Sequence, residues 1–562
     1  MSTPTDADTP TSSLRISMTL SGGASLGAYQ AGAAAGLLTA VRHLTHEESV
    51  ETTVDAIGGA SAGSLVALCA AHSLLEGIDP VRLLHEAWVE GVSLELLRGR
   101  GGRAPLSFER LRDRVPALLE PRDESGGPTE RGPRQEHPIA VHVGLTGLQG
   151  LNYPIRGLRR DRPVTGTTYA DWGRFQLEPG GGLEQITKPE GEAPLDFVLA
   201  SAAHPGGFAP RILDRRRDEK GYESRGIENF PESGKLWYAD GGLMQSQPLG
   251  RVLAAARHLE GGGGDARRIH LLIDPRSEDP AGSGQWSDPD FDPSWQIGLA
   301  RSLAILPAQV LYEDLRRIEK DNSRILWADQ LIEALAPHLG EGAAEALREV
   351  IGRIDEDREG LRADEPELED ARERSGDGDG DGDGEGEGAR LLRRAVDEIA
   401  GLAGERPVEV DVISPLLVLD EPGGSVTSLL AGELMGDFGG FLSRELRASD
   451  FGLGYESVLA WLPDGLDRCG VDADAAKRTV GAVEGCRLYG WEDVRRGDAG
   501  VGDLTWEARL QIVRQGLQTA RVLASGAGDV RALRERLGNP LERMRGMIAG
   551  RSGRGGGGQD GG

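Results

Sequence analysis

The sequence predicts an α/β protein with a mainly parallel central sheet covered by helices. Two strand–loop–helix units stand close together near the N-terminus. In the first, the apolar run 14–20 leads through a glycine-rich loop into an alanine-rich helical pattern over 26–41. In the second, the strand pattern 54–57 leads through a tight turn into a helix over 64–75. A helix between successive strands makes the strands parallel, so the sheet is expected to be mainly parallel.

Later segments extend this core. Further strands are expected at 139–145, 236–239, 269–273 and 408–413. Further helices are expected at 194–203, 295–306, 308–354, 425–447 and 505–525, with Pro307 separating the second from the third.

These patterns predict a division of the chain into seven parts. They are a disordered N-terminal tail (1–13), an α/β core (14–285), a helical excursion (286–354), an acidic Gly/Asp-rich disordered linker (355–388), a helix-strand-helix region that returns to the core (389–470), a C-terminal helical extension (471–550) and a glycine-rich disordered tail (551–562).

Composition sets limits on function. The 562 residues are 38% apolar and include 83 glycines, which is an ordinary globular composition. The net charge of −28 is uneven, because 16 acids and four arginines in 355–388 contribute −12 of it. The remaining −16 still disfavours nucleic-acid binding, which needs a basic face.

The linker 355–388 also has an alternative interpretation as a calcium loop. Asp377, Asp379, Asp381 and Gly382 match the first half of an EF-hand loop. The twelfth position is Gly388, where a bidentate glutamate is required. A solvated linker is the interpretation we favour, and we expect no metal or organic cofactor.

The cysteines and the N-terminal sequence bear on the cellular location of the protein. Cys69, Cys469 and Cys486 are too few and too scattered for a disulfide scaffold or a four-ligand zinc site. The N-terminus has no apolar signal-peptide region, and no stretch approaches the ~20 apolar residues of a membrane span. We therefore expect a cytoplasmic protein, with peripheral contact to a membrane surface left open.

A candidate nucleophile lies in the second loop. The pentapeptide Gly59-Ala60-Ser61-Ala62-Gly63 matches G-x-S-x-G directly between a strand and a helix, which is the context of a nucleophile elbow. Its small residues allow the sharp turn that presents a serine at a helix N-terminus. The alternative is a glycine-rich turn with a helix-capping serine.

Candidate oxyanion donors lie in the first loop, Ser21 to Gly27. Backbone N–H groups at a helix start can hold the oxyanion that forms when a serine attacks a carbonyl. The alternative is a phosphate-binding turn, but neither GxGxxG nor GxxxxGK[ST] fits the loop.

A candidate carboxylate follows the strand at 236–239. In Asp240-Gly241-Gly242, the aspartate could take the serine proton or orient a base. Alone, the motif is also a common structural turn.

Together these motifs resemble those of the patatin-like phospholipase family, which has a glycine-rich oxyanion loop, a GxSxG serine and an Asp-Gly-Gly/Ala motif in this order. The segment 200–210 is similar to the family's Ala-Ser-x-Ala-x-Pro-x-x-Phe-x-Pro motif. The similarity covers about 14–274. A further segment, 447–454, is similar to an Asp-Phe-x-Leu-Gly segment of some bacterial members.

The resemblance implies a three-layer patatin-like fold and a serine acyl hydrolase that cleaves lipid acyl esters, phospholipid or neutral glyceride. It implies a Ser-Asp dyad of Ser61 and Asp240 rather than a Ser-His-Asp triad. The implied residues are oxyanion donors at Gly22, Gly23 and Ala24, elbow glycines at Gly59 and Gly63, and supporting glycines at Gly27, Gly241 and Gly242.

The sequence departs from the family pattern at two places. The loop has Ala24 where the family has its third glycine and Leu26 where it has a basic residue. Ser246-Gln247 precedes Pro248, where the family often has asparagine. His204 is the rival catalytic base, and we expect a packing or loop role for it.

Competing functions stay open. One is an inactive patatin-fold protein that binds lipid or serves as a scaffold, which we rank below the hydrolase because Ser61 and Asp240 are both intact. Another, a nucleotide-binding α/β protein, lacks a fitting phosphate motif and would be revived only by nucleotide-dependent stabilisation. Apolar residues over 88–97 or after 295 are candidates for a substrate entrance, although a core role is favoured for each stretch. The lipid head group, the acyl position, the oligomeric state and the role of the C-terminal helices are left undecided.

Overall fold

A computed structural model of the chain describes residues 13–98, 104–120, 131–155, 164–205, 207–258, 266–276, 290, 295–335, 338, 346, 349, 391–393, 395–396, 408–419, 429–431 and 439–490. The acidic segment 355–388, with its calcium-loop motif, the helical pattern 505–525 and the tail 551–562 lie outside the described residues.

An eight-stranded sheet forms the centre of the molecule. Its strands are β1 (Ser13–Leu20), β2 (Glu51–Gly59), β3 (Ile139–Ile155), β4 (Val164–Leu177), β5 (Arg211–Asp214), β6 (Lys235–Ala239), β7 (Arg267–Ile273) and β8 (Val410–Ile413). The order is β5-β6-β3-β2-β1-β7-β8, with β4 also paired to β3. The strands β3, β2, β1, β7 and β8 are parallel, and β4, β5 and β6 add antiparallel pairs. The predicted fold class is therefore confirmed.

All six predicted strands are present, but β4 and β5 were not predicted. Along the second half of β4, residues at 171–177 alternate between buried and partly or fully exposed, and charged and glycine residues interrupt the apolar pattern. The strand β5 has only four residues, two of them charged. Neither segment carries the apolar run by which the other strands were recognised.

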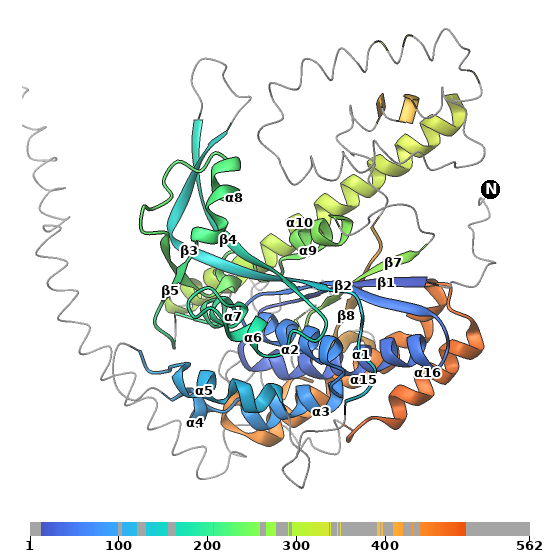
Figure 1. Cartoon of the computed structure of the whole chain (residues 1–562), viewed down its shortest axis with the longest axis horizontal. Coiled ribbons are helices and arrows are strands. Elements are labelled where there is room, and N and C mark those ends of the chain that lie inside the picture. Colours follow the sequence, from blue (N-terminus) through green and yellow to red (C-terminus); the bar gives the residue numbers. More distant parts are fainter. Residues whose placement is uncertain are drawn as a thin grey trace, which may run out of the picture.

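Helices cover both faces of the sheet (Figure 1). They are α1 (Gly27–His46), α2 (Ala62–Glu76), α3 (Pro80–His85), α4 (Leu94–Leu97), α5 (Glu109–Leu119), α6 (Glu184–Thr187), α7 (Pro194–Ser201), α8 (Glu219–Ser224), α9 (Leu249–His258), α10 (Trp295–Leu335), α15 (Arg444–Arg468) and α16 (Ala473–Gly485). Figure 1 shows α1, α2, α15 and α16 below the sheet and α9 and α10 above it. None of the described helices is both long and apolar enough to span a bilayer.

Two helix predictions were wrong. The helix α10 continues through Pro307, because a proline removes one backbone hydrogen bond without ending a helix whose other turns are intact. At 439–442 the chain forms a 3-10 turn, and α15 begins only at Arg444, where the Ser443 side chain caps it by accepting from the amides of Glu445 and Leu446.

The C-terminal helix α15 packs closely against α1. A Cβ on Gly32 would lie 1.9 Å from the carbonyl oxygen of Phe451, and one on Gly454 would lie 1.9 Å from that of Tyr29. Glycine at both positions lets the two backbones touch. The segment 439–490 is therefore part of the same core as the N-terminal βα units, although it stands some 400 positions later in the chain.

We expect Gly454→Ala to lower the free energy of unfolding by about 2–3 kcal/mol, because the added methyl group meets backbone that can move only if the helices separate. Urea unfolding would measure this. The matched control is Gly481→Ala on α16, where a Cβ meets nothing within 4 Å, and which should stabilise by up to about 1 kcal/mol. Equal effects of the two substitutions would contradict the close approach of α1 and α15.

Candidate active site

Ser61 lies in the turn between β2 and α2, with backbone dihedrals φ 52° and ψ −126°. This φ is in the left-handed region, which side-chain-bearing residues rarely adopt, so the backbone is strained there. The flanking glycines make room for the turn. A Cβ on Gly59 would lie 2.4 Å from the backbone carbon of Gly63, and one on Gly63 would lie 2.5 Å from the carbonyl oxygen of Leu20. This is the geometry expected of a nucleophile elbow.

Asp240 faces this serine from the end of β6. The Ser61 hydroxyl donates to Asp240 Oδ2 at 2.7 Å, and the Gly242 amide donates to Oδ1 at 2.7 Å. Both residues are more than nine-tenths buried. The sheet brings them together, because β6 pairs with β3 and β3 pairs with β2. Among the described residues, the Ser61 side chain bonds with this carboxylate and with no histidine.

Burial changes the acidity of this carboxyl group. It raises the pKa of Asp240 to about 6, although the Ser61 hydroxyl, the Gly242 amide and the charge of Arg276 each act to lower that pKa. A carboxyl with such a pKa is mainly ionised at neutral pH and can still hold a proton during a reaction. Burial and the charge of Arg276 both lower the pKa of His204.

The glycine loop lies beside the serine. A Cβ on Gly22 would lie 3.4 Å from the Ser61 Cβ. The amide of Gly22 donates to the carbonyl of Ser246 at 2.9 Å, and the amide of Leu26 donates to the carbonyl of Gly23 at 2.8 Å. Among the described residues, no protein atom accepts a hydrogen bond from the amides of Gly23 or Ala24. Of the three predicted donors, these two therefore have amides without a protein partner.

A network of buried hydrogen bonds holds the glycine loop, Ser21 to Gly27, in place. The Ser21 hydroxyl donates to Asp274 Oδ1 at 3.1 Å and accepts from Gln30 Nε2 at 3.1 Å. Asp274 follows β7, its pKa is raised by burial, and its Oδ1 also accepts from the amide of Arg276 at 3.0 Å. From the C-terminal segment, the amide of Gly440 donates to the Ser25 hydroxyl at 3.0 Å. Segments from both ends of the chain thus fix this loop.

Ser201, at the end of α7, was not singled out by sequence reasoning. Its hydroxyl accepts from the amide of Ser61 at 2.8 Å and donates to the carbonyl of Gly144 at 2.6 Å. Ser201 is fully buried. Its position within the segment 200–210 was the available signal, since that segment was compared with a family motif. The amide of Ser61 is therefore engaged by this hydroxyl.

Two of the three supporting glycines, Gly241 and Gly27, leave room for a close neighbour. A Cβ on Gly241 would lie 2.1 Å from the carbonyl oxygen of Gly144, and one on Gly27 would lie 2.1 Å from the ring of Trp88. Trp88 is only 2% exposed, so it is a core residue, as favoured from the sequence, and not part of an open entrance. Gly242 instead contributes its amide to Asp240.

Residues 18–253 match the family model described as patatin-like phospholipase. The chain contains a patatin-like phospholipase domain. This match supports a lipid acyl hydrolase at the level of the family, and both Ser61 and Asp240 lie inside the matched range. The helices α10, α15 and α16 lie outside it, although α15 packs on the α1 helix of the patatin-like domain.

The crystal structure of VipD from Legionella pneumophila matches this chain at 12% sequence identity, covering 88% of this chain and 93% of that chain, with a TM-score of 0.20. A score this low supports no structural argument. No curated protein matches the chain.

Ala24, at the position of the family's third glycine, also has a backbone φ in the left-handed region. Its φ is 45°, which glycine adopts without cost. We therefore expect Ala24→Gly to raise the free energy of unfolding by about 0.5–1 kcal/mol, the strain relief being partly offset by the freer unfolded chain. Thermal unfolding would measure it. A loss of stability would mean that the alanine methyl group contributes packing that outweighs the strain.

Proposed function

We propose that the chain is a serine acyl hydrolase that cleaves lipid acyl esters with Ser61 as nucleophile and Asp240 as base. The observation that carries the proposal is the 2.7 Å hydrogen bond between the Ser61 hydroxyl and the Asp240 carboxylate, at a strained strand-to-helix turn. The family match supports the reaction class.

In the proposed mechanism, Asp240 takes the hydroxyl proton while Ser61 Oγ attacks the ester carbonyl carbon. The amides of Gly23 and Ala24 hold the resulting oxyanion, and that of Gly22 joins them only if it releases Ser246. As the C–O bond to the alcohol breaks, Asp240 returns the proton to the departing alcohol. Water then attacks the acyl carbon while Asp240 takes a proton from it, and Asp240 returns this proton to Ser61 Oγ as the bond to the acyl group breaks and the fatty acid leaves.

A pKa of about 6 suits Asp240 to both halves of this cycle. At pH 7–8 the carboxyl is mostly ionised and can accept the serine proton. Burial makes the protonated form accessible during the reaction, because it disfavours the charged form. Peripheral contact with a membrane surface, which would bring a lipid substrate to this site, belongs to the same proposal.

An inactive lipid-binding or scaffold function is the second candidate. It is favoured by the replacement of the family's basic loop residue with Leu26, whose side chain is fully buried and leaves no cation in that loop. The two candidates differ in whether Ser61 reacts.

Labelling with a fluorophosphonate probe tests the proposal. We expect label on the wild-type protein and on His204→Ala, but none on Ser61→Ala and little on Asp240→Asn, each variant shown to be folded by circular dichroism. Folded wild-type protein that takes no label in the presence of lipid vesicles would favour the scaffold function. Loss of label in His204→Ala alone would replace the dyad with a histidine-dependent mechanism.

A further inference from the structure

Arg447 is a buried arginine of α15 whose guanidinium group, among the described residues, donates only to backbone carbonyls. Its Nε and Nη2 donate to the carbonyl of Val89 at 3.0 and 2.8 Å. Its Nη1 donates to the carbonyls of Gly440 and Ser443 at 2.8 and 3.2 Å. The residue is only 4% exposed, and burial lowers its pKa to about 10, so it keeps its charge at neutral pH. A buried charge is costly unless polar groups surround it, and here the three carbonyls do so.

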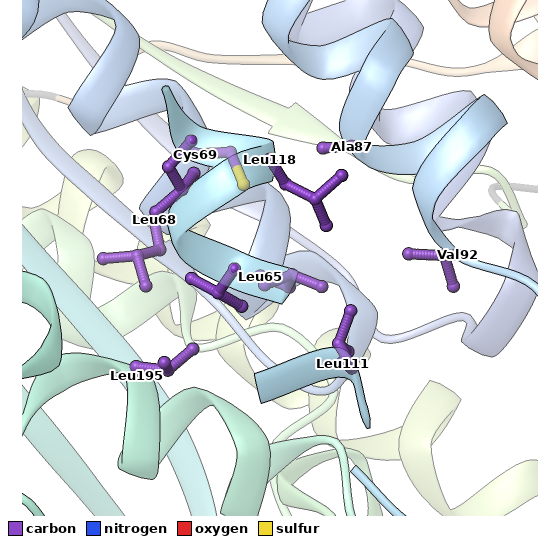
Figure 2. A pocket seen from close by; sticks show the side chains of 10 residues that line it. Leu65, Leu68, Cys69, Ala87, Val92, Leu111, Leu118 and Leu195 are labelled. Carbon is purple, nitrogen blue, oxygen red and sulfur yellow. The ribbon is translucent and has the colours of Figure 1, made fainter. Parts of the chain in front are cut away.

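The first of these carbonyls belongs to a turn that is fixed in the core. Val89 lies in the π-helical turn η2 (Glu86–Gly91). Ala87 of this turn, and Val92 directly after it, line an apolar gap in the core together with Leu65 and its neighbours on α2 (Figure 2). The apolar packing gives Arg447 a firm attachment at Val89.

The backbone of Gly440 connects Arg447 with the glycine loop. Its carbonyl accepts from Arg447, and its amide donates to the Ser25 hydroxyl at 3.0 Å. A Cβ on Gly440 would lie 2.9 Å from the Ser25 Cβ and 3.4 Å from the Arg447 Cγ, so this backbone is packed between the two side chains. Ser25 is fully buried and directly follows Ala24, whose amide is a proposed oxyanion donor. The chain of contacts from Arg447 therefore ends one residue from that donor.

The loop needs attachments of this kind. Ala24 has φ 45°, which an alanine adopts only at a cost, so surrounding contacts have to maintain it. The hydroxyls of Ser21 and Ser25 make such contacts on either side of the amides of Gly23 and Ala24. The contact at Ser25 depends on the C-terminal segment.

We propose that Arg447 is a positioning residue for the proposed reaction. It fixes the backbone of Gly440 and, through it, the Ser25 hydroxyl. The amides of Gly23 and Ala24 are thereby kept where the oxyanion forms. This inference rests on the proposed function, and it adds to the catalytic unit a segment that lies beyond the residues matched by the family model.

Hydrolysis of p-nitrophenyl butyrate by the full-length protein tests the inference. Arg447→Lys keeps the charge, but an ammonium group lacks the guanidinium fork that bonds two segments at once. We expect kcat to fall about 10- to 100-fold, with KM changed by less than about twofold. Ser25→Ala, which removes the acceptor of the Gly440 amide, should lower kcat about tenfold. Wild-type kcat in both variants would overturn the inference.

The matched control is Arg444→Gln, one turn earlier on α15. Arg444 Nε donates to Glu90 Oε1 at 2.9 Å, so this ion pair also joins α15 to η2, but among the described residues it makes no contact with the glycine loop. We expect wild-type kcat in this variant. A loss as large as that in Arg447→Lys would mean that any weakening of α15 lowers activity, and would overturn the specific role of Arg447.

A double variant tests whether the two residues act through the same contacts. If Arg447 acts through Gly440 and Ser25, the combination of Arg447→Lys with Ser25→Ala should lose no more activity than the weaker of the two single variants. A loss equal to the product of the two single losses would show that Arg447 acts by another route, and would overturn the inference.

Hydrogen–deuterium exchange provides a measurement that does not depend on catalysis. The segment 21–27 contains the amides of Gly22 and Leu26, which donate to backbone carbonyls. We expect these amides to exchange about tenfold faster in Arg447→Lys, while peptides from β1 exchange as in the wild type. Unchanged exchange in 21–27, or an equal increase in β1, would overturn the inference.

The two measurements separate this inference from the proposed function. A wild-type protein that cleaves no ester would contradict the hydrolase, whereas faster exchange confined to 21–27 in Arg447→Lys would still support the positioning of the loop by Arg447. Equal kcat in wild type, Arg447→Lys and Ser25→Ala would leave the hydrolase intact and reduce Arg447 to a contribution to stability.

Discussion

Asp240→Asn is expected to lower activity by about 10²–10⁴-fold and, at the same time, to raise the free energy of unfolding at pH 7.5 by about 1–2 kcal/mol. The loss of activity follows from the loss of the base that accepts the Ser61 proton. The gain in stability follows from burial. The pKa of the Asp240 carboxyl is raised from 3.8 to about 6, so the folded protein holds the ionised form at a cost of up to about 3 kcal/mol.

The sign of the pH dependence follows from the same shift. Between about pH 4 and pH 6 the folded protein binds the Asp240 proton more tightly than the unfolded chain does. Stability should therefore fall as the pH rises through this window, and the cost is complete above pH 6. The stability advantage of Asp240→Asn should thus be largest at pH 7.5 and should disappear toward pH 4. Part of the advantage is lost because an asparagine oxygen can replace only one of the two hydrogen bonds from Ser61 and Gly242.

Urea unfolding of wild type and Asp240→Asn at pH 7.5 and pH 4.5 would measure this difference. Ser61→Ala is the control, because it also removes activity but keeps the buried carboxylate. Its stability should still fall as the pH rises, and over a wider pH range than in the wild type, because the Ser61 hydroxyl that lowers the Asp240 pKa is gone. A variant Asp240→Asn that is less stable than wild type at pH 7.5 would show that the hydrogen bonds to the carboxylate outweigh its burial. The activity of the wild-type protein should correspondingly fall below about pH 6, as Asp240 becomes protonated.

The sequence predicted the elements of the site because each depends on local residues. A tight turn between a strand and a helix requires small residues, and 59–63 contains nothing larger than serine. The contact between Ser61 and Asp240 joins residues 179 positions apart, which no local pattern specifies, and it was expected only through the family resemblance. Likewise, the close contact of α1 and α15 depends on single glycines within helices, where the sequence alone does not show what lies opposite them.

Backbone recognition by side chains is harder still to predict. Ser201 acts on an amide and a carbonyl, and every residue has these groups, so no partner residue type reveals its role. The same holds for Ser246, whose carbonyl accepts from the Gly22 amide. The contact uses no side chain of Ser246, so it does not depend on which residue stands at position 246.

Ser201→Ala is the second substitution with a large expected effect, a loss of about 10²-fold in kcat. Without the hydroxyl, the Ser61 amide and the Gly144 carbonyl lose their bridge, while the strained φ of Ser61 remains costly. A small relaxation of the turn would move Ser61 Oγ from its position at Asp240, and displacements of about 1 Å can cost about 10²-fold. The rate of fluorophosphonate labelling and kcat should fall together, with little change in KM.

The control for this substitution is Ser73→Ala, on the same α2 helix. Ser73 is also buried and donates to a backbone carbonyl, that of Ile78 at 2.7 Å, but it lies at the far end of the helix from the elbow. Both variants should lose about 1 kcal/mol of stability, and only Ser201→Ala should lose activity. Ser201→Thr keeps the hydroxyl and should recover most of the labelling rate. Equal activity in Ser201→Ala and Ser73→Ala would mean that Gly59 and Gly63 maintain the turn at Ser61 without a contribution from α7. Ser201 would then contribute to the stability of the fold and not to activity.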